Sequence, residues 1–547
     1  MAPDAHDYLL PGQVTLADAG ELLGRRLALR EGATRSAGRR FYDTFDGLVR
    51  AAGLEASFEN GRLSLTDTGA GSGVGAGSGV GPGSGVGGGS GVGGGSDVGA
   101  GSGEVLAVAD VAEPPERLLA YELPSGPLRD RLKAVIDVRA LLPLVHLESE
   151  VRELGVVASD DKLVVRLALE RPAVITRSGR RIALRARVRL FGVRGYGEEL
   201  AEVREALADL GLARAEHTVL DEAVLAAGGL LGGVSSKIEV ELSAGERSDV
   251  AGAAVLGRLL EVIEANLPGT IADVDAEFLH DFRVAVRRSR AVQRELKGVF
   301  PPVQLAFHRG ELRWLQQVTG VSRDLDVYVL EFDDFRASVP EQFRADLDPL
   351  LAVLRGRRLT ARREMVRELR SDRAREAMTS WGAFLARLSA LPEEGRPDAA
   401  RPIAEVAGER ISKVYRRMLR MGRAIDASTP PEAYHELRKK AKELRYLLEL
   451  LGAPLFPGEV VKPMVRSLKA LQDVLGRHQD REVQVATLRS LAEEVSALTG
   501  GAAALMAMGL LVDRLLIDER AARGEFAQTF HEFASGEQRK LVKDTFS

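Results

Sequence analysis

Two stretches of this chain carry a histidine followed by basic residues at a helical spacing. The first reads HDFRVAVRRSR from His280, and the second reads HELRKKAKELR from His435. At about 100° per residue, positions i, i+3, i+7 and i+10 fall within one narrow stripe of a helix. The two predicted basic stripes are therefore His280, Arg283, Arg287 and Arg290, with Arg294 one turn further, and His435, Arg438, Lys442 and Arg445.

The basic stripes suggest a binding site for a repeating anion. Like charges along one helix face cost a few tenths of a kcal/mol per neighbouring pair, so two matched rows favour a compensating anion. Guanidinium groups match phosphate oxygens in bidentate geometry, and linear polyphosphate presents such oxygens along its length. Aromatic residues for base stacking are not interleaved, which argues against nucleic acid. The alternatives are solvated helix faces and histidines that serve only as structural hydrogen-bonding or capping groups.

The segments that follow the two stripes also match. Each stripe is followed by Phe-Pro, at Phe300 and Phe456, and then by a second helix that carries Arg313 or Lys469. That helix ends in GVSRDLDV from Gly320 or in GRHQDREV from Gly476. Apolar residues occupy the opposite face of each basic helix, so one face is expected to pack and the other to present cations. The helical half, from about residue 251, should form two related bundles.

The first 213 residues have the pattern of an α+β domain. Residues 61–65, 162–169 and 182–191 read as strands, and in the last of these apolar residues alternate with Arg185, Arg187 and Arg189. Residues 69–103 consist almost entirely of Gly, Ser, Val and Ala, which predicts a disordered tether inserted into this domain. Residues 214–250 are weakly patterned and are expected to form a connector.

Composition restricts the function further. The chain has 547 residues, no cysteine and a net charge of −4, so thiolate catalysis and cysteine-based metal sites are excluded. No apolar run reaches about 18 residues, and no basic, apolar leader follows Met1. We therefore expect a cytoplasmic protein that does not enter membranes, with no cofactor and no metal.

The motifs in the helical half resemble the conserved histidine α-helical domain, or CHAD domain. The resemblance rests on HDFRVAVRRSRA, RDLDV, HELRKKAKELRYLLEL and LKALQDVLGRHQD, and it covers residues 251–535. It implies two pseudo-symmetric helical bundles around a basic groove that binds inorganic polyphosphate. The residues implied in binding are His280, Arg283, Arg287, Arg290, Arg313, His435, Arg438, Lys442, Arg445 and Lys469.

The N-terminal half resembles the CYTH domain of triphosphate tunnel metalloenzymes in the segment RRFYDTFDGLVRAAGL from Arg39. That family opens on an ExExK strand, whereas this chain has Ala5 and Asp7 near the corresponding positions. Two later strands reverse the charges expected of the family: one carries Glu148 and Glu150, and the other carries the three arginines of 182–191. Metal-assisted triphosphate hydrolysis needs carboxylates for the cation and bases for the phosphates. The sequence thus predicts a degenerate, non-catalytic CYTH-like domain.

The leading interpretation is a non-enzymatic polyphosphate-binding protein, for which polyphosphate or polyester granules are the expected site of association. Three alternatives stay open at this point. The first is a metal-dependent triphosphatase or polyphosphatase that works from the N-terminal domain. The second is a nucleic-acid-binding protein, and the third is a scaffold for partner proteins.

Overall fold

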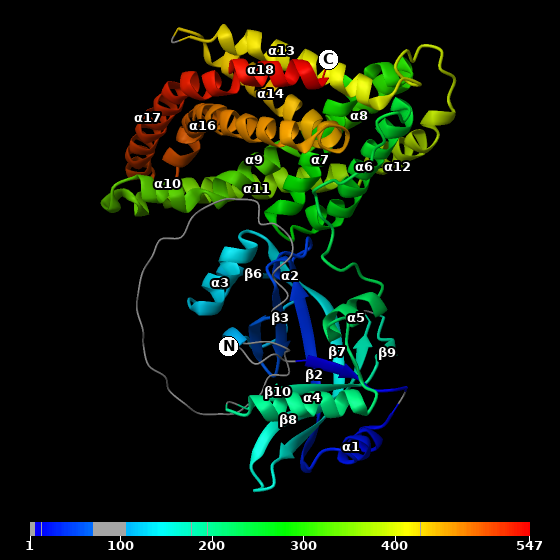
Figure 1. The fold of residues 1–547 in the computed structure, drawn as a ribbon. Coiled ribbons are helices and arrows are strands. Elements are labelled where there is room, and N and C mark those ends of the chain that lie inside the picture. Colours follow the sequence, from blue (N-terminus) through cyan, green and yellow to red (C-terminus); the bar gives the residue numbers. More distant parts are fainter. Residues whose placement is uncertain are drawn as a thin grey trace. The chain divides into compact units, whose positions relative to one another are not determined.

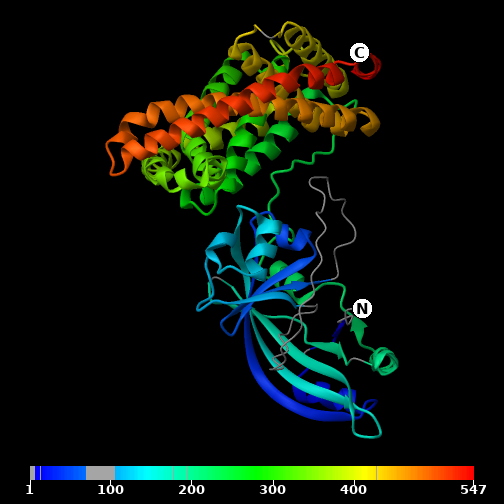
Figure 2. The same cartoon turned by 90° about the vertical axis from the view of Figure 1, so that its left-hand side faces the viewer.

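The computed structural model describes residues 6–12, 14–68, 105–176, 178–193, 195–426 and 428–546. The chain divides into two compact units, Met1–Ser235 (unit 1) and Ser236–Ser547 (unit 2). Figures 1 and 2 show unit 1 as a curved sheet with helices and unit 2 as helices alone. This confirms the predicted fold class, an antiparallel α+β domain followed by an all-α domain. The expected tether, residues 69–103, lies outside the described residues.

Unit 1 is built on one antiparallel sheet with the order β11-β1-β10-β8-β7-β2-β3-β4-β5, in which β6 pairs with β7 and β9 with β8. The strands are β1 (His6–Leu9), β2 (Leu29–Asp43), β3 (Leu54–Glu59), β4 (Arg62–Asp67), β5 (Val105–Asp110), β6 (Leu118–Leu119), β7 (Ala140–Val157), β8 (Leu163–Ile175), β9 (Arg181–Ala183), β10 (Arg187–Gly192) and β11 (Ala213–Arg214). The helices are α1 (Leu16–Gly24), α2 (Leu48–Ala51), α3 (Pro127–Ile136), α4 (Gly197–Asp209), α5 (Val219–Ala226) and the 3-10 turn Ala120–Glu122.

The segment 182–191, expected as one strand, is divided between β9 and β10. Ala183 pairs with Ala173 of β8, whereas Arg187 pairs with Glu170, so the register changes by one residue between the two pairs. Such a change reverses which side chains point inward. It buries Arg187 and Arg189 and leaves Arg185 exposed.

Helix α5 lies in the stretch expected to be a connector. Thr218 begins it, because the Thr218 side chain accepts a hydrogen bond from the backbone N–H of Asp221 at 3.1 Å. Val219 and Ala223 of α5 pack on the sheet beside Phe41 and Leu147. The sheet unit therefore extends beyond residue 213.

Unit 2 contains thirteen α-helices among the described residues: α6 (Ser248–Ala272), α7 (Ala276–Glu295), α8 (Pro302–Val318), α9 (Gly320–Leu330), α10 (Phe332–Ser338), α11 (Asp348–Leu369), α12 (Asp372–Ala386), α13 (Ile403–Arg423), α14 (Pro431–Leu447), α15 (Ala453–Leu455), α16 (Gly458–Ser496), α17 (Gly501–Phe533) and α18 (Gly536–Phe546). A π-helical turn, Leu448–Gly452, follows α14. No helix among the described residues combines the length and apolar character needed to cross a membrane.

The internal repeat recurs in the packing of unit 2. Helix α6 packs on α7 as α13 packs on α14, and α7 packs on α8 as α14 packs on α16. The main apolar core draws on all of these helices, so the two repeats share one interior. They differ at one point. The first repeat breaks at Thr319 between α8 and α9, whereas α16 continues through the equivalent position.

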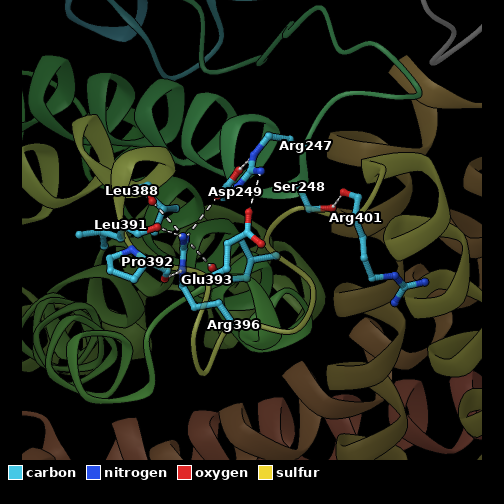
Figure 3. Close-up of polar contacts among 10 residues, drawn as sticks. Arg247, Ser248, Asp249, Leu388, Leu391, Pro392, Glu393, Arg396 and Arg401 are labelled. Carbon is cyan, nitrogen blue, oxygen red and sulfur yellow. Dashed lines mark hydrogen bonds and ion pairs between the residues drawn. The ribbon is translucent and has the colours of Figure 1, made fainter.

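A buried arginine in the loop before α13 connects that loop to the start of α6 (Figure 3). The Arg396 side chain is fully buried and donates to the carbonyl oxygens of Pro392 (2.8 Å), Leu388 (3.0 Å) and Leu391. Its Nη1 also lies 3.4 Å from the carboxylate of Asp249, which is itself fully buried near the start of α6. These contacts satisfy carbonyls that the 3-10 turn at 388–390 leaves free.

The segment 236–247 crosses unit 2 without regular secondary structure. Ile238, Val240 and Leu242 are partly buried against the main core, and the alternating Lys237, Glu239 and Glu241 are exposed. This strap, residues 236–247, therefore belongs to the helical unit and covers part of its core.

Candidate functional site

The two predicted basic stripes lie on α7 and α14, which pack against each other inside unit 2. Asp275 begins α7 by accepting hydrogen bonds from the backbone N–H groups of Glu277 (2.9 Å) and Phe278 (3.2 Å). Pro431 occupies the first turn of α14, where a missing N–H costs nothing. Phe282 and Leu437, on the opposite faces, are fully buried. Core packing thus turns the basic faces of both helices away from the apolar core.

The two histidines occupy equivalent hydrogen-bonded positions. Nδ1 of His280 lies 3.0 Å from Nη2 of Arg323 on α9, and Nδ1 of His435 lies 2.7 Å from Oε1 of Gln479 on α16. Arg323 and Gln479 are each the third residue after the repeated glycine. Because a guanidinium can only donate, His280 accepts at Nδ1. Both histidines therefore connect a basic helix to its neighbour.

Arg283 and Arg438 are also engaged by the protein. Nη1 of Arg283 donates to the carbonyl of Gln316 and to Oγ1 of Thr319, both at 2.8 Å, and the residue is only 8% exposed. Burial, with repulsion from Arg287, lowers the pKa of Arg283 to about 10. The break at Thr319 frees the carbonyl that Arg283 caps. Since α16 is unbroken, Arg438 instead pairs with Asp480, at 2.9 and 3.3 Å.

Arg287 and Lys442 have no direct partner for their charges in the described part of the chain. Among the residues that the structure describes, neither side chain makes a hydrogen bond or an ion pair. Both line a cavity of about 490 Å³ between α7 and α14, which we call the central groove. Burial, followed by repulsion from Arg438 and Arg287, lowers the pKa of Lys442 to about 8. Desolvation together with like charges is common at functional sites.

The central groove has a strong excess of positive charge. Its two carboxylates are Glu436, which pairs with Lys439 at 2.6 Å, and Glu443, which pairs with Arg294 at 2.6 Å and with Lys440 at 2.9 Å. The basic side chains on its walls are Arg287, Arg290 and Arg294 from α7, Arg417 from α13, and Lys439, Lys440 and Lys442 from α14.

A second cavity, of about 280 Å³, lies between α7 and α8, and we call it the side pocket. Arg290 and Arg294 line both cavities, and Arg309 and Arg313 of α8 complete the side pocket. Arg290 donates to the side-chain amide oxygen of Gln316. Burial lowers the pKa of Arg290, and Arg313, Arg294 and Arg309 lower it further. The structure thus brings Arg290 and Arg313, two of the predicted residues, to one pocket.

The remaining two predicted residues are not among those that line either cavity. Arg445 is next to Glu449, at 3.5 Å, and lies over the ring of Tyr446. Lys469 is exposed on α16 and lines neither cavity. The predicted set missed Arg309, Arg417, Lys439 and Lys440, which line the cavities. For Arg309 a signal was available, because it precedes Arg313 by four residues and so shares its helix face.

Glu277, His280 and Asp281 on α7 could in principle hold a metal ion, since one ligand atom from each lies within 4.8 Å of the others. Arg323 already occupies this position. Its Nη2 lies 3.0 Å from Nδ1 of His280 and 3.6 Å from the carboxylate of Glu277. The guanidinium supplies the positive charge that a metal ion would bring, so the donor set fits an ion-pair network.

The interior of the sheet in unit 1 holds charged residues that neutralise one another. Glu170 of β8 contacts Arg39 at 2.8 Å, Arg189 at 3.1 Å and Oγ of Ser149 at 2.6 Å. Burial alone would raise the pKa of Glu170, but the arginines and Ser149 outweigh burial and hold the pKa at about 2. Asp7 lies 3.1 Å from Arg187 and 3.4 Å from Arg189.

The proposed reversal of charge in unit 1 is therefore only partly visible in its interior. Arg187 and Arg189 face inward, but Arg185, Glu148 and Glu150 are exposed and take no part in the interior network. Ala5 lies outside the described residues. The inward arginines already have carboxylate partners, as the ion pairs above describe.

Comparison with known proteins identifies one family. Residues 254–489 match the model described as the CHAD domain, so the helical half contains a CHAD domain, as its motifs predict. The antiparallel sheet of unit 1 is compatible with a CYTH-like fold.

Two curated relatives match part of the chain. An uncharacterized protein of Mycobacterium tuberculosis strain H37Rv is 30% identical over 211 residues, and these cover 38% of this chain and 38% of that protein. An uncharacterized protein of strain CDC 1551 gives the same values. The chain thus spans well under half the length of these relatives.

Two solved structures are similar to the chain. The crystal structure of the CHAD domain from the plant Ricinus communis is 24% identical and covers 53% of this chain and 95% of its own, with a TM-score of 0.45. PptA from Streptomyces chartreusis is 16% identical and covers 52% of this chain and 100% of its own, with a TM-score of 0.39.

Proposed function

Since residues 254–489 form a CHAD domain, we propose that this protein binds inorganic polyphosphate in the central groove and does so without catalysing a reaction. The observation that carries the proposal is the pair Arg287 and Lys442. Both are cations on the walls of one cavity, and neither has an acidic partner among the described residues. Both are partly buried, and partial burial of cations that lack a direct partner is unfavourable, so a bound anion would stabilise this arrangement.

The shape and chemistry of the central groove support this ligand class. About 490 Å³ lies within the roughly 300–1,000 Å³ typical of ligand sites. Arginine and lysine side chains converge on it from α7, α13 and α14, and the only aromatic side chain on its walls, within the described chain, is Tyr446. Single-stranded nucleic acid is usually held by several aromatic platforms. Phosphate oxygens without bases are the better match.

Polyphosphate binding would also allow the protein to associate with polyphosphate or polyester granules. We infer that such an association would depend on the helical unit. In unit 1 the inward arginines are already paired with inward carboxylates, as Arg39 and Arg189 are with Glu170, so few free groups are left for phosphate or a metal ion.

The test is a titration of long-chain polyphosphate into wild type and the Arg287→Ala, Lys442→Ala double variant at two salt concentrations. Each lost charge-assisted contact should weaken binding roughly tenfold to a hundredfold, and low salt should strengthen binding. The control is Arg357→Ala with Arg477→Ala, which removes two cations from exposed ion pairs with Glu494 and Glu525. Duplex DNA serves as competitor. If the double variant binds as wild type does, or if DNA displaces polyphosphate at equal charge, the proposal fails.

A further inference from the structure

The side pocket between α7 and α8 has the composition of an anion site of its own. Arg290, Arg294, Arg309 and Arg313 line it, and no carboxylate does so among the described residues. Arg309 and Arg313 stand four residues apart on α8 with Gly310 between them, so their side chains repel each other on one helix face. Neither makes an ion pair in the described structure.

Gln293 adds a second, independent observation. It is fully buried, it lines the side pocket, and neither its Nε2 nor its Oε1 has a hydrogen-bond partner. A buried amide without partners costs about 1–3 kcal/mol, and native proteins keep few of them. Its NH₂ group could donate to an oxygen of a bound oxyanion. Four guanidinium groups and one unpaired amide donor fit a phosphate group.

The side pocket and the central groove are neighbours that share Arg290 and Arg294. An anion in the groove and an anion in the pocket would therefore contact the same two guanidinium groups. A linear chain of linked phosphates can satisfy both positions at once, whereas separate phosphates would repel each other. The shared arginines make the two cavities suited to one continuous ligand.

The second repeat does not reproduce this pocket. The position equivalent to Arg294 is Glu449, which lies 2.9 Å from Arg288 and 3.5 Å from Arg445. The position equivalent to Arg309 is Val465. The corresponding surface is thus already neutralised and has lost one cation.

We propose that the side pocket is a second phosphate-binding site, built only in the first repeat, and that a polyphosphate chain filling the central groove continues into it. The proposal rests on the proposed function of the groove. It assigns Arg294, Arg309 and Gln293 to ligand binding. It also makes the binding surface one-sided, so that Lys469 and its neighbours on α16 contribute little.

The experiment compares two double variants of the full chain. Arg309→Ala with Arg313→Ala removes the cations that belong to the side pocket alone. Arg466→Ala with Lys469→Ala removes two exposed cations from the equivalent helix of the second repeat. Each is titrated with long-chain polyphosphate, with tripolyphosphate and with orthophosphate. All four residues are exposed, so both variants should fold.

For long-chain polyphosphate the side-pocket variant should lose roughly tenfold to a hundredfold in affinity, and the α16 variant should bind as wild type does. Tripolyphosphate, which the groove can hold alone, should bind both variants equally. Orthophosphate tests whether the side pocket also accepts free phosphate. If it does, wild type should bind orthophosphate more tightly than the side-pocket variant does.

Gln293→Leu is the second variant. If the amide is only structural, replacing it with an apolar side chain should stabilise the protein and leave binding unchanged. We expect weaker binding of long chains without loss of stability. Wild-type affinity in the Arg309, Arg313 variant, or an equal loss in the α16 variant, would overturn the inference. If the Arg287, Lys442 variant binds weakly while the Arg309, Arg313 variant binds as wild type does, the proposed function of the groove stands and only the side-pocket inference fails.

Discussion

Lys442 on α14 and Arg287 on α7 line one cavity, neither forms an ion pair among the described residues, and Arg287 is among the groups that depress the pKa of Lys442. Burial makes the largest contribution to that depression, and Arg438 and then Arg287 add repulsion. The two equivalent helices of the internal repeat thus bring like charges together, and this repulsion does not contribute to the stability of the fold.

Removing one of these repelling cations should stabilise the free protein while weakening the bound state. We expect Arg287→Gln to raise the free energy of unfolding by a few tenths of a kcal/mol without polyphosphate. With polyphosphate in excess, wild type should be the more stable form, because a ligand that binds only the folded state raises its stability by mass action. Thermal unfolding with and without polyphosphate measures both. A variant that is less stable in both conditions would show that Arg287 is structural.

Binding should depend on the protonation of Lys442. Its pKa in the free protein is lowered to about 8, below the usual lysine value, so the ammonium is lost as the pH rises through that range. A polyanion favours the charged form and raises this pKa, so affinity should fall above about pH 8. Lys442→Arg stays protonated and should keep its affinity. Titrations across the pH range measure this, and the same decline in both proteins would contradict it.

Glu295 at the end of α7 should destabilise the protein above neutral pH. Burial raises its pKa, and a hydrogen bond and repulsion from Glu443 raise it further, to about 7. Above that pH the carboxyl is ionised in both the folded and unfolded states, and the full free-energy cost of holding the buried charge destabilises the fold. Below about pH 4.5 it is protonated in both, and the cost vanishes.

We therefore expect Glu295→Gln to stabilise the protein at pH 8 by on the order of 1–3 kcal/mol, with the gain shrinking toward pH 5. Glu443→Gln is the contrasting variant, because Glu443 accepts from Lys440 and pairs with Arg294. That change should destabilise the protein. Urea unfolding at the two pH values is the measurement, and a gain that is independent of pH would exclude the carboxyl pair as its origin.

The Arg396 cluster should be essential for the stability of unit 2. Replacing Arg396 by Met leaves the carbonyls of Leu388, Leu391 and Pro392 without this donor, and leaves Arg247 as the remaining side-chain partner of the buried carboxylate of Asp249. The loss should cost about 3–5 kcal/mol. Arg401, also labelled in Figure 3, is about one-third exposed and pairs with Asp398 and Glu409. Arg401→Ala should cost no more than about 1 kcal/mol. Equal losses of unfolding free energy in the two variants would show that burial of Arg396 is not the cause.

Unit 1 should not hydrolyse phosphoanhydrides. Its inward arginines already contact inward carboxylates, as Arg187 contacts Asp7 and Glu222 at 3.1 and 2.6 Å. A substrate and its metal ion would have to break these buried ion pairs. We expect no release of phosphate from tripolyphosphate, nucleoside triphosphate or polyphosphate with Mg²⁺ or Mn²⁺. Sustained turnover that Arg187→Ala abolishes would contradict this.

Helical spacing predicted which cations share a face, but not which of them the fold would engage. Arg287 and Arg283 are equivalent in the pattern of α7. The difference between them arises at Thr319, where a helix break exposes a carbonyl to Arg283. Asp480 engages Arg438 in the other repeat from 42 residues away. Both effects depend on tertiary packing, which a stripe on one helix does not contain.

The strand pattern of residues 182–191 illustrates the same limit. Alternation along one segment predicted that Arg185, Arg187 and Arg189 share a face. A one-residue change of register against β8 separates Arg185 from the other two. The strap was missed as well, because residues 214–250 were interpreted as a weakly patterned connector, although Ile238, Val240 and Leu242 alternate with charged residues. The sequence does not show which surface the strap covers, which is the core of the helical unit.

The strap also determines where the helical unit can be separated from the rest of the chain. Its apolar side chains cover part of the main core. A fragment that begins near residue 251, where the helical pattern begins, would lose this cover together with Asp249, the buried partner of Arg396. The uncovered apolar strip would then be available to other copies, and oligomers or aggregates would form as concentration rises. A fragment that begins at Ser236 keeps its own cover and should stay monodisperse.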